Sequence, residues 1–132
     1  MTLQPPLWQP QTEWIPPDEF PDLSTYTEIA IDLETKDPDL IKMGSGSVTS
    51  NGHVTGIAVA VEGWSGYYPI AHEGGGNMDR DRVLSWFRDV MKTNALKIFH
   101  NAMYDMSWII TLPAGAILAI ICYKILALYL IA

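Results

Sequence analysis

The sequence predicts a mixed α/β domain, and three patterns support this prediction. Residues 28–33 and 53–61 are short runs rich in valine, isoleucine and alanine, which is typical of strands. Residues 78–92 repeat their apolar side chains at helical spacing. A short strand at 95–99 leads directly into a second helical pattern that begins at Asn101. The expected order is therefore strand, strand, strand, helix, strand, helix.

The first strand is followed by an expected antiparallel hairpin. Turn-forming residues at 35–39 and a Gly/Ser loop at 44–47 separate the first strand from the hairpin. The hairpin consists of residues 53–61 and 67–70, joined by a turn at 62–66. His72 follows it, beside a glycine-rich loop, and a histidine in that position is expected to be an ordinary surface residue.

The helix at 78–92 is the clearest amphipathic segment. Asn77 or Asp79 can cap its start. Its aromatic side chains are expected in the core rather than on a stacking platform. The residues expected to be buried are Val83, Leu84, Trp86, Phe87, Val90 and Met91. Asn101 is the expected cap of the second helix, which places Asp105 about one turn into it.

Composition divides the 132 residues into three parts. Residues 1–25 are rich in proline and are expected to form an extended arm, residues 26–112 the core, and residues 113–132 an apolar tail. The net charge of −7 argues against a protein that coats DNA non-specifically. The single cysteine, Cys122, excludes an intramolecular disulfide and a cysteine-based zinc site. No signal peptide is recognisable at the N-terminus, so a cytoplasmic location is expected.

Two carboxylates end the first strand. Asp32 and Glu34 are two residues apart, so their side chains leave the same face of a strand. They repel each other unless a proton or a cation lies between them. From these residues alone, two interpretations stay open: a divalent-metal site, or two solvated acids where a strand ends. Asp105 follows the strand at 95–99 and gives a third carboxylate a route to the same end of the sheet.

These residues resemble a known family. Asp32-x-Glu34, followed by Lys97-Ile98-Phe99-His100-Asn101-Ala102-Met103-Tyr104-Asp105, is similar to the first two motifs of the DEDD exonucleases. The second stretch looks especially like the 3′–5′ proofreading exonuclease domain of family A DNA polymerases, including those of phages. The resemblance covers about residues 26–112. It implies a ribonuclease H-like fold, a mixed five-stranded sheet with flanking helices, here C-terminally incomplete.

The resemblance also implies two-metal hydrolysis of DNA 3′ ends, with Mg²⁺ or Mn²⁺ as the cofactor. Asp32 would bridge both ions, Glu34 would hold one and help to orient the attacking water, and Asp105 would bind the other. The implied substrate-binding residues are Thr35, Asn101 and Tyr104. The implied partners are a single-stranded DNA 3′ end and, in a full-length relative, a polymerase domain.

The sequence departs from the family at its third motif. A later Tyr-x-x-x-Asp or His-x-x-x-Asp is required, but no aspartate or glutamate follows Asp105, and Tyr123 precedes Ala127 by four residues. The second ion is therefore expected to bind poorly and the activity to be impaired. A truncated or frame-altered gene product would explain the difference. An inactive ribonuclease H-like module that binds nucleic acid or a replication partner is the first alternative.

The tail offers the second alternative. Residues 114–132 carry one charge, Lys124, and are long enough to span a bilayer. A small membrane-anchored protein would use this segment as its anchor. We favour the other interpretation, in which residues 117–123 form the fifth strand and residues 124–132 begin a helix.

Overall fold

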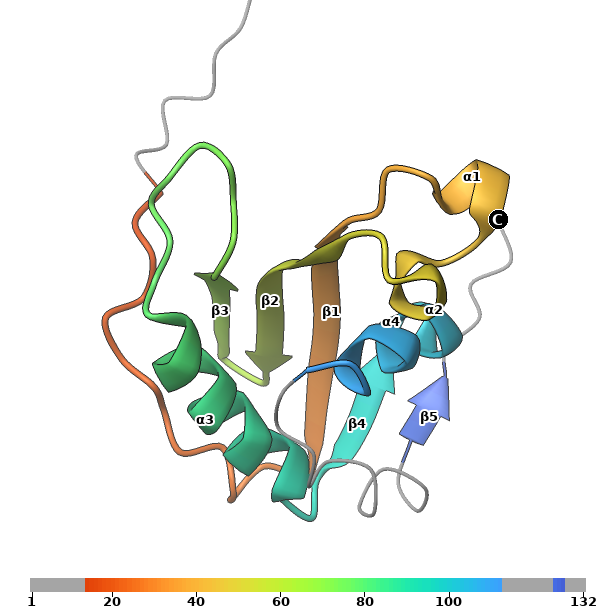
Figure 1. Ribbon diagram of the computed structural model, residues 1–132. Coiled ribbons are helices and arrows are strands. Elements are labelled where there is room, and N and C mark those ends of the chain that lie inside the picture. Colours follow the sequence, from red (N-terminus) through yellow and green to blue (C-terminus); the bar gives the residue numbers. More distant parts are fainter. Residues whose placement is uncertain (1–13, 113–124, 128–132) are drawn as a thin grey trace, which may run out of the picture.

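A computed structural model describes residues 14–112 and 125–127 of the chain. Its centre is a five-stranded sheet in the order β3-β2-β1-β4-β5 (Figure 1). The strands are β1 (Glu28–Lys36), β2 (His53–Val61), β3 (Trp64–Pro69), β4 (Leu96–Phe99) and β5 (Ile125–Ala127). β1, β2 and β3 form an antiparallel meander, and β4 and β5 run parallel to β1. The predicted ribonuclease H-like mixed sheet is confirmed.

The register leaves the end of β1 without a neighbour on the β4 side. The parallel pairing of β1 with β4 begins at Glu28 and Leu96 and ends at Ile31 and Phe99. On its other side β1 stays paired with β2 as far as Lys36. The last residues of β1 therefore extend past β4, toward the helix that follows β4.

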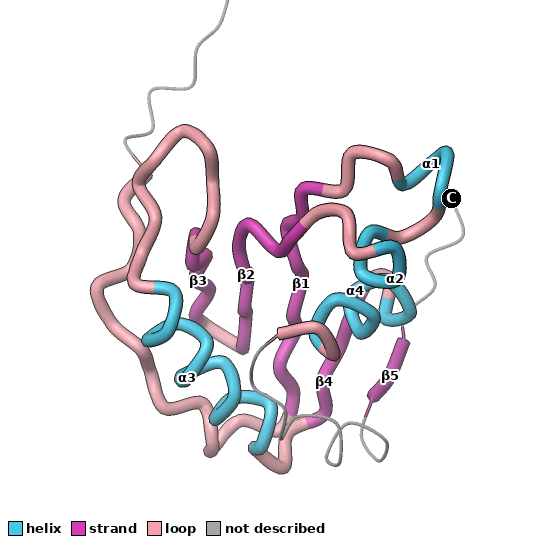
Figure 2. Tube along the Cα trace, viewed as in Figure 1, coloured by secondary structure: helices cyan, strands magenta, loops and turns pink. Residues whose placement is uncertain are grey.

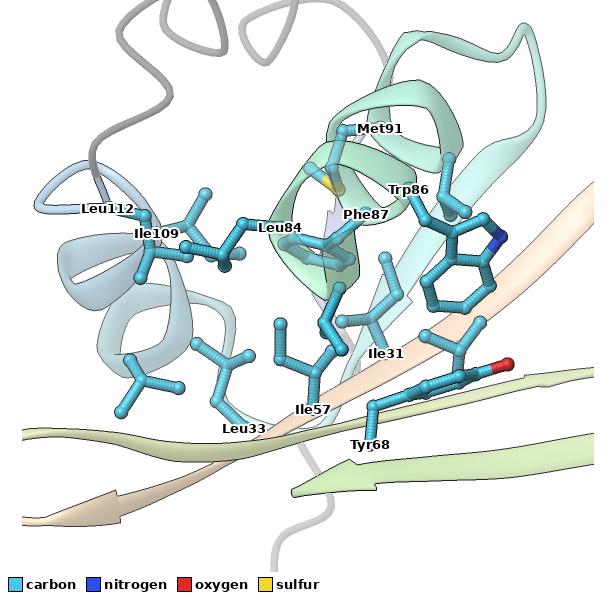
Figure 3. Close-up of a cluster of buried hydrophobic side chains, with 14 of the residues drawn as sticks. Ile31, Leu33, Ile57, Tyr68, Leu84, Trp86, Phe87, Met91, Ile109 and Leu112 are labelled. Atoms are coloured by element: carbon cyan, nitrogen blue, oxygen red, sulfur yellow. The ribbon is translucent and has the colours of Figure 1, made fainter. Parts of the chain in front are cut away.

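Two helices, α3 (Arg80–Lys92) and α4 (Ala102–Ile109), lie on the same face of the sheet (Figures 1 and 2). The Asp79 side chain caps α3 by accepting a hydrogen bond from the Arg82 amide at 2.9 Å. The six residues of α3 that were expected in the core are all buried. Figure 3 shows Leu84 and Phe87 of α3 facing Leu33 of β1 and Ile57 of β2. This interface is the hydrophobic core.

Strand β1 separates apolar from acidic side chains. Ile29, Ile31 and Leu33 are buried beneath the helices, whereas Asp32 and Glu34 are exposed. Because neighbouring side chains in a strand point to opposite faces, the two acids leave the face that α3 does not cover.

The proline-rich arm packs against the domain over the part that the structure describes. The Phe20 ring stacks on Tyr68 at a centroid distance of 5.5 Å. Trp86 Nε1 donates a hydrogen bond to the Pro21 carbonyl at 2.9 Å, and the Tyr68 hydroxyl donates one to the Glu19 carbonyl at 3.0 Å. These contacts hold residues 19–21 against β3 and α3. Residues 1–13 of the arm lie outside the described part of the chain.

Three element boundaries differ from the sequence-based expectation. β1 continues three residues beyond Leu33, because its pairing with β2 continues through a bulge after Glu34. β3 begins at Trp64, within the expected turn. The connection from β1 to β2 contains two short helices, α1 (Leu40–Met43) and α2 (Gly46–Thr49), where only a turn and a loop were expected.

The fifth strand was placed wrongly. It was expected at residues 117–123, but the structure has it at Ile125–Ala127, paired with Lys97–Phe99 of β4. A helix was expected over residues 124–132, but residues 125–127, the part of this range that the structure describes, form a strand. Residues 113–124 and 128–132 lie outside the described part. Among the helices that are described, none is long and apolar enough to cross a membrane.

Candidate active site

The exposed acids of β1 lie opposite the smallest possible neighbours. Asp32 pairs with Ala58 of β2, and Glu34 pairs with Gly56. Residues paired across a sheet share one face, so no bulky β2 side chain crowds either carboxylate. The local sequence of β2 therefore keeps this acidic face accessible.

Asp105 brings the third carboxylate to this region from α4. The residue lies in the first turn of the helix and is only 3% exposed. Burial raises the pKa of Asp105 to about 6, and repulsion by Asp32 adds to the effect. Hydrogen bonds with the backbone of Leu33 and of Asn101 oppose this rise, as does the nearby His100. The contact with Leu33 places Asp105 at the end of β1, beyond its pairing with β4.

Lys97 shows how a buried charge is normally accommodated in this fold. It is 4% exposed, and its Nζ donates to the Thr93 carbonyl at 2.9 Å, the Thr93 hydroxyl at 3.0 Å and the Ala95 carbonyl at 2.9 Å. Asp105 is equally buried but lies near another acid. The Asp32–Asp105 pair is thus a place where bound positive charge, a proton or a cation, is favoured.

The three predicted metal ligands do not form a ready cluster. Within residues 14–112 and 125–127, no three His, Cys, Asp or Glu side chains are grouped so that they could hold an ion. The structure brings Asp105 near Asp32, while Glu34 interacts with Tyr67. The chemistry of the pair still suits Mg²⁺ or Mn²⁺, because hard cations prefer oxygen ligands. Mg²⁺ in particular is often held by one or two carboxylates, with waters and phosphate completing its shell.

The predicted substrate-binding residues lie around the end of β1. The Thr35 hydroxyl and the Tyr104 hydroxyl are 2.7 Å apart and hydrogen bonded. Asn101 is exposed at the start of α4, and its carbonyl accepts hydrogen bonds from the amides of Tyr104 and Asp105 at 3.1 Å each. Asn101 occupies the expected N-cap position of α4, but its side chain makes no capping hydrogen bond. The backbone of Asn101, rather than its side chain, positions the start of α4.

Asp37 is a residue that the sequence reasoning missed. Its carboxylate accepts a hydrogen bond from the Tyr104 hydroxyl at 3.0 Å and from the Gly46 amide at 3.1 Å. A second link to α2 runs from the Ser47 hydroxyl to the Ser107 hydroxyl at 2.7 Å. The insertion between β1 and β2 therefore fixes the Tyr104 side chain. No local pattern could indicate this, because the two contacts that reach α4 join residues 67 and 60 positions apart.

Comparison with known proteins adds independent information. No family model matches the chain. Over 114 residues it is 41% identical to a protein named DNA-directed DNA polymerase from Pseudomonas phage M6. The chain is similar to a segment of a phage DNA polymerase. The match covers 81% of this chain but 17% of that polymerase. It supports a polymerase-related region, in agreement with the resemblance seen in the sequence motifs.

Proposed function

We propose that the chain is the 3′–5′ exonuclease region of a family A, phage-type DNA polymerase. In this proposal it removes nucleotides from single-stranded DNA 3′ ends with the help of Mg²⁺ or Mn²⁺. The phage polymerase relative, the ribonuclease H-like sheet and the acids at the end of β1 support it. The observation that carries most weight is the approach of buried Asp105 to Asp32.

Each acid has a distinct part in the proposed site. Asp105 is held by burial and by the backbone of Leu33, so its carboxylate is a fixed ligand. Asp32 is exposed on the strand and faces the incoming substrate, and Glu34 joins from the same face. A bound divalent ion would stabilise charge on the phosphate and lower the pKa of its own water ligand. Tyr104 and Thr35, which hydrogen bond to each other, would orient the DNA end.

The net charge of −7 is compatible with this substrate. Carboxylates alone would repel a DNA phosphate, but a divalent ion between Asp32 and Asp105 reverses the local charge. Binding of DNA should therefore depend on the metal ion. Residues 106–132 contain no acid, so for this segment by itself we expect one ion to bind firmly, a second weakly, and turnover to be slow.

The same missing acid favours a second candidate, an inactive ribonuclease H-like module that binds DNA or a replication partner. The two candidates differ in whether the 3′ end is shortened. A single-stranded oligonucleotide labelled at its 5′ end is incubated with the protein and Mn²⁺, and the products are resolved by length. The proposed exonuclease produces a ladder of shortened products, whereas the inactive module leaves the oligonucleotide intact and shifts it in a native gel.

Asp32→Ala is the decisive variant in this assay. We expect a loss of more than about 100-fold, beyond the effect typical of residues that merely orient a metal ligand. Glu62→Ala is the matched control, because Glu62 is an exposed acid in the turn between β2 and β3. It should retain full activity. Equal activity of Asp32→Ala and the wild type would refute the proposal.

A further inference from the structure

Tyr67 on β3 lies on the same face of the sheet as the acids of β1. The register aligns Tyr67 with Ala58 of β2 and Ala58 with Asp32 of β1, so these residues form one row across the sheet. The next row contains Gly56 and Glu34. Because residues in one row share a face, Tyr67 and Asp32 leave the same face of the sheet with Ala58 between them, and the Tyr67 hydroxyl reaches the row of Glu34.

Gly56 provides the space that the Tyr67 hydroxyl occupies. A Cβ atom added at Gly56 would lie 2.0 Å from the Tyr67 hydroxyl oxygen, which no real structure tolerates. The hydroxyl thus takes the place of a side chain at position 56, directly across from Glu34. Paired Cβ atoms in antiparallel strands are about 4.5–5.5 Å apart, which is within reach of an extended glutamate. The charge of Glu34 also contributes to the raised pKa of Tyr67, after the larger effect of burial.

The position of the hydroxyl is fixed from the other side by His72. The Tyr67 hydroxyl and His72 Nε2 form a hydrogen bond, and the two rings meet edge-on at a centroid distance of 5.9 Å. Asn77 holds the backbone of His72: its Oδ1 accepts from the His72 amide at 2.7 Å, and its Nδ2 donates to the His72 carbonyl at 2.8 Å.

An ion pair ties the same loop to the end of β1. Lys36, two residues after Glu34, pairs with Glu73, the residue after His72. The loop that carries His72 is therefore attached both to the Tyr67 side chain and to the strand that carries the acids. Asn77 thus supports His72, and His72 supports the Tyr67 hydroxyl, which lies over Gly56 across from Glu34.

We propose that Tyr67 is a positioning residue for Glu34: supported by His72, its hydroxyl holds the Glu34 carboxylate in the orientation needed to bind a divalent ion. This inference rests on the proposed metal-dependent function. When His72 Nε2 donates to the phenol oxygen, the phenol proton is free to donate to Glu34. Nothing in the sequence indicated this role, because it depends on the register of three strands and on the absence of a side chain at Gly56.

The test uses the full chain and Mn²⁺ alone as the probe, with binding measured by isothermal titration calorimetry. Tyr67→Phe removes the hydroxyl but keeps the ring. We expect its Mn²⁺ affinity to fall by roughly 10-fold, as for other residues that orient a metal ligand. Its unfolding temperature without metal should stay close to that of the wild type. In the nuclease assay, kcat should fall while KM for the oligonucleotide stays unchanged.

Tyr68→Phe is the matched control. It makes the same change at the next residue of β3, but the Tyr68 hydroxyl bonds to the Glu19 carbonyl and its ring packs against Phe20 and Trp86. This variant should lose some thermal stability and keep its Mn²⁺ affinity. Gly56→Ala is a second perturbation of the same contact, since the added Cβ displaces the Tyr67 hydroxyl. It should weaken Mn²⁺ binding as Tyr67→Phe does.

A double-variant comparison tests whether Tyr67 acts through Glu34. If it does, Tyr67→Phe has no further effect on Mn²⁺ affinity once Glu34→Gln is present. Full additivity of the two changes, or wild-type affinity in Tyr67→Phe, overturns this inference and leaves the proposed function intact. No Mn²⁺ binding by the wild type overturns the proposed function, and the inference falls with it.

Discussion

Asp105 makes the stability of the metal-free protein depend on pH. Its pKa is about 6 in the folded chain against an ordinary value of 3.8, so the folded state binds a proton more tightly than the unfolded state. Between these two values the folded state holds more protons, and stability therefore falls as pH rises. Above pH 6 the carboxylate is ionised in both states. Burying its charge next to Asp32 then lowers the free energy of unfolding by its full amount.

Asp105→Asn removes this cost and keeps one oxygen for the backbone hydrogen bonds. We expect the variant to be more stable than the wild type at pH 7.5 in EDTA, by about 1–3 kcal/mol. At pH 3.5 the difference should largely vanish, because Asp105 is then protonated in the folded state and mostly protonated in the unfolded state. Urea unfolding at the two pH values measures this. An equal stability difference at both pH values would show that ionisation of Asp105 is not its cause.

At the level of residues, the local sequence predicted the acids of the site but not the residues that contact and position the site's side chains. The period of two along β1 placed Asp32 and Glu34 on one face, and the position of Asp105 after a strand brought it to the end of β1. Asp37, Tyr67 and His72 were not assigned roles. Their contacts depend on strand register and on the path of an insertion, which a linear pattern does not contain.

The helix α3 is the element whose formation is easiest to trace to single residues. Asp79 satisfies the Arg82 amide at its start, and one apolar face covers the sheet. Asp79→Ala should destabilise the protein by about 1 kcal/mol, the usual cost of losing such a cap. Asp89→Ala is the control, because Asp89 is an exposed acid of the same helix that caps nothing. Its Oδ1 makes only a long ion pair with Lys92 Nζ, at 3.9 Å. Urea unfolding compares the two, and equal losses would contradict the role of the cap.

Elements whose apolar residues recur at a clear spacing, or that are joined by turn residues, were predicted. Element boundaries that depend on pairing with another strand were not. The helix at α3 and the hairpin of β2 and β3 follow from spacing and turn residues. β1 was expected to end too early, because the extension to Lys36 exists only through its pairing with β2. The tail is apolar apart from Lys124, so it contains no alternation of polar and apolar residues that marks a strand. Pairing with β4 selects Ile125–Ala127 instead.

For the whole molecule, the two faces of the sheet have different chemistry. α3 and α4 cover one face, where the core lies. The other face borders a cavity of about 680 Å³, lined by Asp32, Tyr67 and His100 together with small and apolar residues of the arm and of β1, β2, β3 and β4. Asp32 therefore stands at the border of an apolar surface. A cation bound there would neutralise Asp32 and Asp105, and its binding energy would be added to the stability of the folded state.

The most direct test of the account is the unfolding temperature of the wild type and of Asp32→Asn in EDTA and in rising Mn²⁺ concentrations, at pH 7.5. We predict that Mn²⁺ stabilises the wild type, by about 2.7 kcal/mol at a concentration 100 times Kd. The variant should show little or no stabilisation, and Glu62→Gln should behave as the wild type. A wild-type unfolding temperature that does not respond to Mn²⁺, or an equal response in Asp32→Asn, would contradict the existence of a metal site at the end of β1.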